Sequence, residues 1–118
     1  MFRIKRVYAP LALEDAFRVL VDGLWPRGLS KDAAAIDAWL KDIAPSRELR
    51  QWFDHDAERW WEFALRYREE LKAPARAAAL DFLRQAEREK GTVTLLFAAR
   101  NETHNHAVLL REMLMGQP

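Results

Sequence analysis

The sequence predicts a single α/β domain, in which a small, mostly parallel sheet of about four strands is flanked by helices. Strand-like stretches alternate with helical ones along the chain, and 118 residues suit one domain. Residues 92–99 carry an unbroken apolar run after Thr94, which is typical of a strand buried on both faces of a parallel sheet. We therefore treat residues 1–118 as one domain.

Three other stretches have strand character. Residues 2–8 alternate apolar with polar or basic side chains, which predicts a strand with one solvated face, and Pro10 ends it. Residues 17–22 are rich in apolar side chains and lead into a loop at Gly23. Residues 36–43 fit a strand or a helix, and their length and aromatic content favour a strand.

Helices are predicted between and after these strands. Ser30 and Ser46 are N-cap residues for two short helices, because a serine hydroxyl accepts a free backbone N–H. Asp56 caps a longer helix, and Pro74 begins another that stops at Gly91. In chain order, the predicted helices cover residues 31–35, 47–53, 57–71, 74–90 and 104 or 105 to 115.

Composition narrows the class of protein. The chain has no cysteine, no apolar leader and no apolar run near the ~20 residues that cross a bilayer, so we expect a cytoplasmic protein without a membrane partner. Its formal net charge of only +1 creates no overall positive field that would attract nucleic acid, so a nucleic-acid partner is not expected.

Two segments at predicted strand ends concentrate polar chemistry. Residues 22–27 and 98–106 each follow a predicted strand. In open parallel sheets, ligands collect beyond the carboxyl ends of the strands. We therefore expect the two segments to lie side by side and to form the working surface.

At these segments the sequence resembles the YeaO-like family, a bacterial group filed under domain of unknown function 488. The resemblance implies an α/β fold and no agreed reaction. This chain departs from the family pattern at Gly23, where Arg is usual, at Asp54, where Gly is usual, and at Asn101, where Asp is common. The resemblance is carried by residues 18–31, 39–46, 49–53, 55–56, 94–100 and 104–107.

Charged residues of the two segments have two interpretations. Asp22 could act as a base, bind a metal or pair with an arginine that fixes the loop, because buried charges require partners. Arg27 and Arg100 could clamp an anion through paired hydrogen bonds, aided by the N-terminus of the last helix, or could pair with carboxylates such as Asp42 and Asp56.

The three histidines, His55, His104 and His106, could ligate Zn²⁺ or Fe²⁺ if the 104–106 stretch is extended. His106 could instead face the core. His104 is the preferred acid or base, and Asp22 is the other catalytic candidate.

We therefore predict a protein that binds a small anionic molecule, or an enzyme acting on one. The ligand-binding candidates are Trp25, which could stack on a planar ligand, together with Arg27, Arg100 and Asn105. A metal-binding protein and a non-catalytic module for protein or nucleic acid are the alternatives. Because Trp60 and Trp61 cannot share a helix face, one could lie between subunits, although the oligomeric state stays open.

Overall fold

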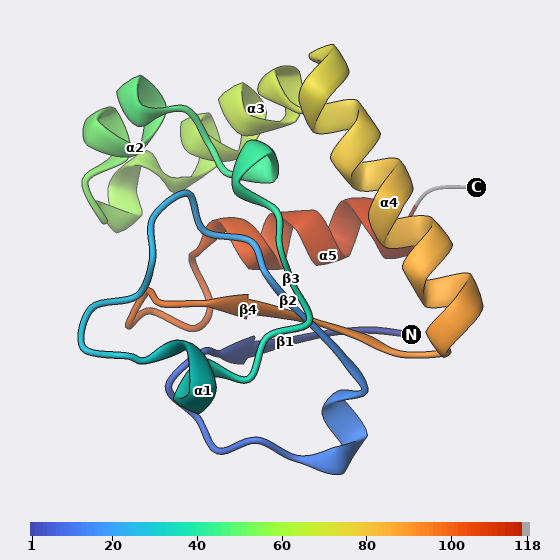
Figure 1. The fold of residues 1–118 in the computed structure, drawn as a ribbon. Helices are drawn as coiled ribbons and strands as arrows, with labels where there is room; N and C mark the ends of the chain where they lie inside the picture. Colours follow the sequence, from blue (N-terminus) through green and yellow to red (C-terminus); the bar gives the residue numbers. More distant parts are fainter. Residues whose placement is uncertain (117–118) are drawn as a thin grey trace.

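The computed structural model describes residues 1–116 and contains a four-stranded, wholly parallel sheet in the order β1-β4-β2-β3 (Figure 1). The α/β class and the parallel sheet predicted from the sequence are therefore confirmed. The strands are β1 (Phe2–Arg6), β2 (Phe17–Leu20), β3 (Ala38–Trp39) and β4 (Val93–Phe97).

Strand β4 lies between β1 and β2, and all of its residues are buried. Val93 is level with Phe2 on one side and with Phe17 on the other, and four residues later Phe97 is level with Arg6. Because this register is unshifted, β1, β2 and β4 end at the same edge of the sheet. We call this edge the rim.

Helices cover the two faces unequally. In Figure 1, α3, α4 and α5 lie on one face of the sheet and the short α1 lies on the other. The α-helices are α1 (Lys31–Ala34), α2 (Arg47–Phe53), α3 (Trp60–Glu70), α4 (Pro74–Lys90) and α5 (His106–Gly116), and the 3-10 turns are η1 (Leu13–Asp15), η2 (Lys41–Ile43) and η3 (Ala57–Arg59). No helix in this described part of the chain is both long and apolar enough to span a bilayer.

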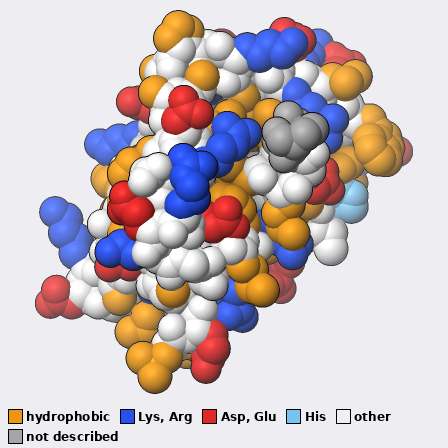
Figure 2. All heavy atoms as spheres, turned by 90° about the vertical axis from the view of Figure 1, so that its right-hand side faces the viewer, with side chains coloured by type: hydrophobic (Ala, Val, Ile, Leu, Met, Phe, Trp, Pro, Cys, Tyr) orange, Lys and Arg blue, Asp and Glu red, His pale blue; other side chains and the backbone are white. Residues whose placement is uncertain are grey.

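The core is divided by the sheet. The main cluster lies under α3, α4 and α5 and includes Leu95, whereas a small cluster under α1 comprises Val7, Leu20, Ala34 and Leu96. Outside the core, Lys and Arg side chains are interspersed with Asp and Glu on the face shown in Figure 2.

The strand predicted over residues 36–43 is wrong in extent. Only Ala38–Trp39 pair with β2, and the chain then turns into η2. Ile43 is fully buried, and its amide donates to Leu40 O at 3.2 Å within the turn. Burial of Ile43 against α4 therefore replaces continued pairing at this edge of the sheet. The predicted helix over 57–71 likewise begins as the 3-10 turn η3, before α3 starts at Trp60.

Candidate functional site

Asp22 joins the two segments that the sequence singled out. It follows β2, and its Oδ2 accepts the backbone N–H of Ala98, just beyond β4, at 2.9 Å. Figure 1 shows the loops after β2 and β4 on the same side of the molecule. Residues 22 and 98 are thus held together at the rim, as expected from the strand ends.

His106 is the imidazole that contacts Asp22. Its Nε2 lies 3.0 Å from Val21 O and 3.2 Å from Asp22 Oδ1. Only 14% of the His106 side chain and 17% of the Asp22 side chain are exposed. Nε2 of His106 therefore faces two oxygen acceptors, Val21 O and Asp22 Oδ1. Its single N–H is donated to Val21 O, which has the better hydrogen-bond geometry.

The Asp22 carboxylate faces the protein interior. Within residues 1–116, its Oδ1 is buried and has no hydrogen-bond partner of good geometry, while Oδ2 is occupied by Ala98. A general base needs direct reach, or reach through one water, to the proton that it takes. The geometry therefore favours the structural interpretation of Asp22, in which the carboxylate fastens the two loops, although its partners are Ala98 and His106 rather than an arginine.

Tyr67 packs against the His106 imidazole. Its ring meets that of His106 edge-on, with 6.2 Å between ring centres, and its hydroxyl donates to Ile43 O at 2.5 Å. Burial raises the pKa of Tyr67 well above its ordinary value, so the phenol stays protonated and remains a donor.

Arg50 is a neighbour that sequence reasoning missed. A Cβ placed on Gly23 would lie 3.8 Å from Arg50 Cζ and 3.4 Å from Ala44 Cβ. These are ordinary contact distances, so α2 and the loop after β2 pack directly against each other at Gly23. Arg50 Nε is buried and has no hydrogen-bond partner within the described residues. Arg50 lies within residues 49–53, which carry part of the family resemblance, but the sequence assigns it no role because it sits inside a short helix far along the chain.

Arg6 and Tyr8 connect the two loops on the other side of the rim. The Arg6 guanidinium donates from Nε to Ala99 O at 3.0 Å and from Nη2 to Ala98 O at 3.1 Å. It also lies over the Tyr8 ring, 5.1 Å from its centre. The Tyr8 hydroxyl in turn donates to Arg27 O at 2.8 Å. Arg6 therefore belongs to this site, although the sequence pattern indicates only that it lies in an alternating strand.

Arg27 and Arg100 are exposed on these loops. Across residues 1–116, no ion pair joins Arg6, Arg27 or Arg100 to a carboxylate. The alternative pairing with Asp42 or Asp56 is not what the structure shows, and Asp56 lies instead 3.6 Å from Arg59. Arg27 and Arg100 thus lie on the rim loops without a carboxylate partner in the described residues.

Trp25 packs inward. Its Nε1 donates to Leu29 O at 2.6 Å, and its ring meets Trp39 edge-on at 5.3 Å between centres. Trp39 Nε1 donates to Asp22 O at 2.7 Å. The two indoles therefore shape the 22–29 loop, which gives Trp25 a packing role beside the ligand-stacking role that the sequence suggested.

The histidines and Asn105 occupy separate surroundings. His55 is exposed with φ of 55°, and the His104 ring lies edge-on to Trp60 at 4.8 Å. Among the described residues, no group of three or more His, Asp or Glu side chains is placed to hold a metal ion. Asn105 is 3% exposed and accepts the amide of Val108 at 3.2 Å, which makes it a cap for α5.

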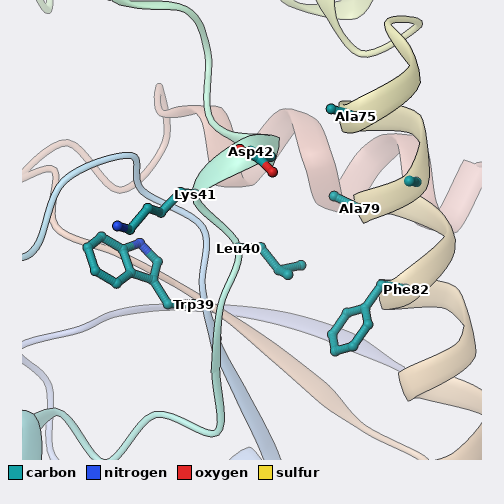
Figure 3. Close-up of a pocket in the computed structure, with 8 residues that line it drawn as sticks. Trp39, Leu40, Lys41, Asp42, Ala75, Ala79 and Phe82 are labelled. Carbon is teal, nitrogen blue, oxygen red and sulfur yellow. The ribbon is translucent and has the colours of Figure 1, made fainter.

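Two open clefts of about 400 Å³ each lie elsewhere. The first runs between the β3–η2 segment and α4, where Leu40 faces Ala79 and Phe82 (Figure 3). The second lies along α2 and α3, beside Arg66 and Glu69. Neither cleft is lined by the rim arginines or by a histidine.

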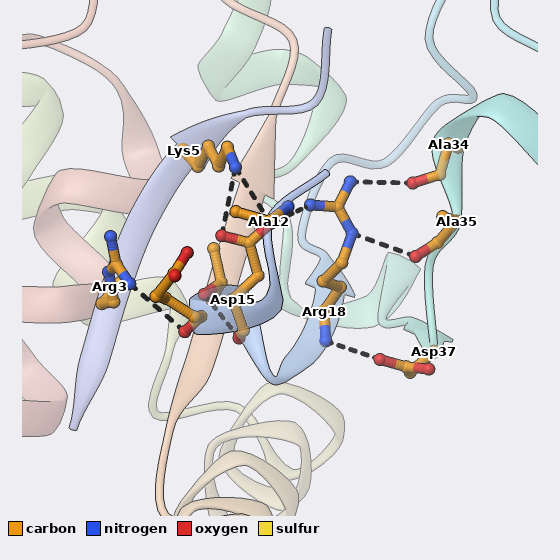
Figure 4. A network of polar contacts seen from close by, with 10 residues as sticks. Arg3, Lys5, Ala12, Asp15, Arg18, Ala34, Ala35 and Asp37 are labelled. Carbon is orange, nitrogen blue, oxygen red and sulfur yellow. Dashed lines mark hydrogen bonds and ion pairs between the residues drawn. The ribbon is translucent and has the colours of Figure 1, made fainter. Parts of the chain in front are cut away.

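A buried ion-pair network also lies outside the rim. Asp15 accepts from Lys5 Nζ at 2.9 Å and from Arg18 Nη1 at 2.5 Å (Figure 4). Arg18 also donates to the carbonyl oxygens of Ala34 and Ala35. The network joins η1, β1, β2 and α1 and has a structural role.

Comparisons with known proteins agree with the family resemblance. The family described as the "Inactive DUF488-N3 subclade" matches residues 1–117. The uncharacterized protein Rv3073c of Mycobacterium tuberculosis (strain H37Rv) is 43% identical over 115 residues, which are 98% of this chain and 94% of that protein. The uncharacterized protein YeaO of Escherichia coli (strain K12) is 40% identical over 111 residues, which are 93% of each chain. No solved structure matches. The chain therefore belongs to the YeaO-like DUF488 family and falls within its DUF488-N3 group.

Proposed function

We propose that this protein binds a small anionic molecule at the rim and does not convert it chemically. The observation that carries the proposal is the set of guanidinium groups at the rim: Arg6 at the end of β1, and Arg27 and Arg100 on the loops that Asp22 and Tyr8 hold together. Arginine binds carboxylate or phosphate groups through paired hydrogen bonds. Because Arg27 and Arg100 are already exposed and lack carboxylate partners in residues 1–116, an anion would not have to displace an ion pair.

The location of the rim supports an anion. Helix α5 begins at His106, shortly after Arg100, and the N-terminus of a helix carries partial positive charge. The formal net charge of the chain is only +1, which provides no global field for an extended polyanion. A compact ligand therefore suits this chain better than an extended polyanion does.

The proposal of binding without turnover has two supports. The Asp22 carboxylate is turned inward, with Oδ1 buried and Oδ2 engaged by a backbone amide. The matching family is described as inactive. Both observations support a protein that binds a ligand at the rim and uses the Asp22 carboxylate and the His106 imidazole only to hold the loops together.

Isothermal titration calorimetry at low salt tests binding with inorganic phosphate, a nucleoside monophosphate and a dicarboxylate. Arg27→Gln and Arg100→Gln should each weaken the best ligand by about tenfold or more, because hydrogen bonds to charged groups contribute about 1.5–3 kcal/mol. Arg88→Gln on α4, where Arg88 hydrogen-bonds Gln85, is the matched control and should leave affinity unchanged. The proposal fails if none of the three anions binds, or if both rim variants bind as the unmodified protein does.

A second candidate is an acid–base enzyme, and the 3.2 Å contact between His106 and Asp22 favours it. Incubating the best ligand with the protein and following it by NMR separates the two functions. Conversion that disappears in Asp22→Asn would favour the enzyme, whereas an unchanged ligand supports binding alone. A metal site that uses His104 with His55 or His106 stays a prediction, and metal analysis of protein purified without a histidine tag tests it.

A further inference from the structure

Arg50 is a cation that the fold partly removes from water without giving it an acceptor. Its side chain is partly buried on α2, and its Nε is buried and has no hydrogen-bond partner within residues 1–116. In the same part of the chain, no ion pair joins its guanidinium to a carboxylate. The charge of Arg50 is therefore left without a partner inside the fold.

An arginine in this position needs an acceptor from outside the chain. Its guanidinium stays protonated in proteins, so it cannot avoid the cost of burial by losing its charge. A charge that is taken out of water is unfavourable unless an opposite charge or a hydrogen-bond acceptor compensates it. An unsatisfied buried group in a native protein thus points to a bound water or ion, and a bound group that balances the charge of Arg50 is an anion.

The guanidinium of Arg50 lies against the loop that follows β2, which Figure 1 shows reaching toward α2. A Cβ placed on Gly23 would lie 3.8 Å from Arg50 Cζ and 3.8 Å from its Nη1. The neighbouring Asp22 is not the counter-ion, because its carboxylate contacts the Ala98 amide and His106 instead. Arg50 therefore adds a partly enclosed cation to the rim.

We propose that Arg50, beside Gly23, is the inner seat of the anion site at the rim and binds an oxyanion group, either a phosphate or a carboxylate. The inference rests on the proposed function, because it names the residue that holds the charged group of the ligand. Arg27 and Arg100 are exposed, so water screens their attraction for an anion. A hydrogen bond to the partly buried Arg50 is screened less and is therefore stronger.

Calorimetric titration of the full chain at low salt, with inorganic phosphate and with acetate, tests the seat. Arg50→Gln should weaken the tighter of the two anions by at least about tenfold. Arg47→Gln is the matched control, because Arg47 is an exposed arginine on the same helix and its loss changes the net charge equally. It should leave the affinity unchanged, and far-ultraviolet circular dichroism checks that both variants fold. The ratio of the two affinities distinguishes a phosphate ligand from a carboxylate one.

A carboxylate built into the chain gives a second test that leaves Arg50 in place. Position 23 tolerates a side chain, because a Cβ there would meet Ala44 Cβ at 3.4 Å and Gly23 is not among the residues with positive φ. Gly23→Asp should occupy the seat, abolish binding of the tighter anion and raise the unfolding temperature in anion-free buffer. Gly23→Asn has the same shape without the charge, so it should weaken binding by a smaller factor.

Failure of the seat and failure of the proposed function give different results. Equal affinity for the tighter anion in Arg50→Gln, Gly23→Asp and the unmodified protein overturns the seat. If Arg27→Gln and Arg100→Gln still weaken binding in that case, the proposed function stands and only the assignment of Arg50 fails. Absence of binding of both phosphate and acetate also overturns the seat, and the proposed function then depends on the nucleoside monophosphate and the dicarboxylate.

Discussion

Asp15 is ionised although it is 1% exposed. Burial alone would raise the pKa of its carboxyl, but hydrogen bonds from Lys5, the Ala12 amide and Arg18 outweigh burial and leave the pKa below its ordinary value. Because the native pKa is lowered, the stabilisation is fully present above the ordinary value of about 3.9 and is lost as the pH falls through the native value.

Asp15→Asn should therefore lower the free energy of unfolding at pH 7 by about 3–5 kcal/mol, because it leaves the buried Arg18 guanidinium without its counter-charge. Urea unfolding across pH 2–7 should also show a flatter acid dependence for the variant. Asp81→Asn, at a side chain that is 79% exposed, is the control. Equal stability of Asp15→Asn and the unmodified protein at pH 7 would contradict the interpretation of the network.

Single residues also show how far sequence reasoning reached. It placed Asp22 at a strand end and brought it beside the 98–106 segment, because that follows from strand polarity alone. It preferred His104 to His106, since only coordinates reveal which imidazole turns toward Val21 O. The structure explains why glycine suits position 54, because this helix-ending residue has a φ of 47°, a left-handed conformation that glycine adopts without strain and that Asp54 adopts here.

At the scale of an element, Ser46 is the best-anchored helix cap. Its Oγ accepts the Leu49 amide at 3.1 Å and donates to Glu70 Oε2, while its own amide donates to Glu70 Oε1 at 2.7 Å. Ser46→Ala should therefore reduce the free energy of unfolding by about 1–2 kcal/mol, because the cap and the link to α3 are lost together.

Ser30→Ala removes a cap of the same kind from the four-residue helix α1, where the serine hydroxyl accepts only the Ala33 amide. We expect the smaller loss there, about 0.5–1 kcal/mol. Guanidinium chloride unfolding of the two variants measures the difference. A larger loss at Ser30 would show that the contact with Glu70 adds nothing to the cap at Ser46.

Both serine caps could be predicted because a cap is a local hydrogen bond between neighbours in sequence. The extent of β3 could not, because the length of an edge strand depends on what packs beside it. Leu40 donates to Leu20 O as the last pairing bond, and the chain then turns so that Ile43 is buried. The same limit applies to Arg50, whose position beside Gly23 arises only when α2 packs on the loop.

At the scale of the whole molecule, the order of the strands is the feature that no local pattern specified. A continuous apolar run marks β4 as a strand buried on both faces, and the structure places it between β1 and β2. Which neighbour lies on which side depends on the crossover helices and on the long-range contacts that they make. For the same reason, the sequence predicted only two of the three rim arginines. Arg6 was missed because it comes from β1, which lies on the opposite side of β4 from β2.

The sheet separates a thick core from a thin one, and β4 contributes neighbouring leucines to each. Leu95 and Leu96 are both fully buried, but Leu95 belongs to the cluster under three helices and Leu96 to the small cluster under α1.

Leu→Ala at a buried site costs about 2–5 kcal/mol of unfolding free energy, and the cost grows with the cavity that the surroundings cannot refill. The long helices that cover Leu95 are fixed by many contacts, whereas the loops and the four-residue helix near Leu96 can move inward. Leu95→Ala should therefore cost about 4 kcal/mol and Leu96→Ala about 2–3 kcal/mol, measured by urea unfolding with unchanged denaturant dependence. A larger cost at Leu96 would mean that the thin layer is the more rigid of the two, and that the loops packed there, including the one that carries Arg27, are held by the core as firmly as the helices are.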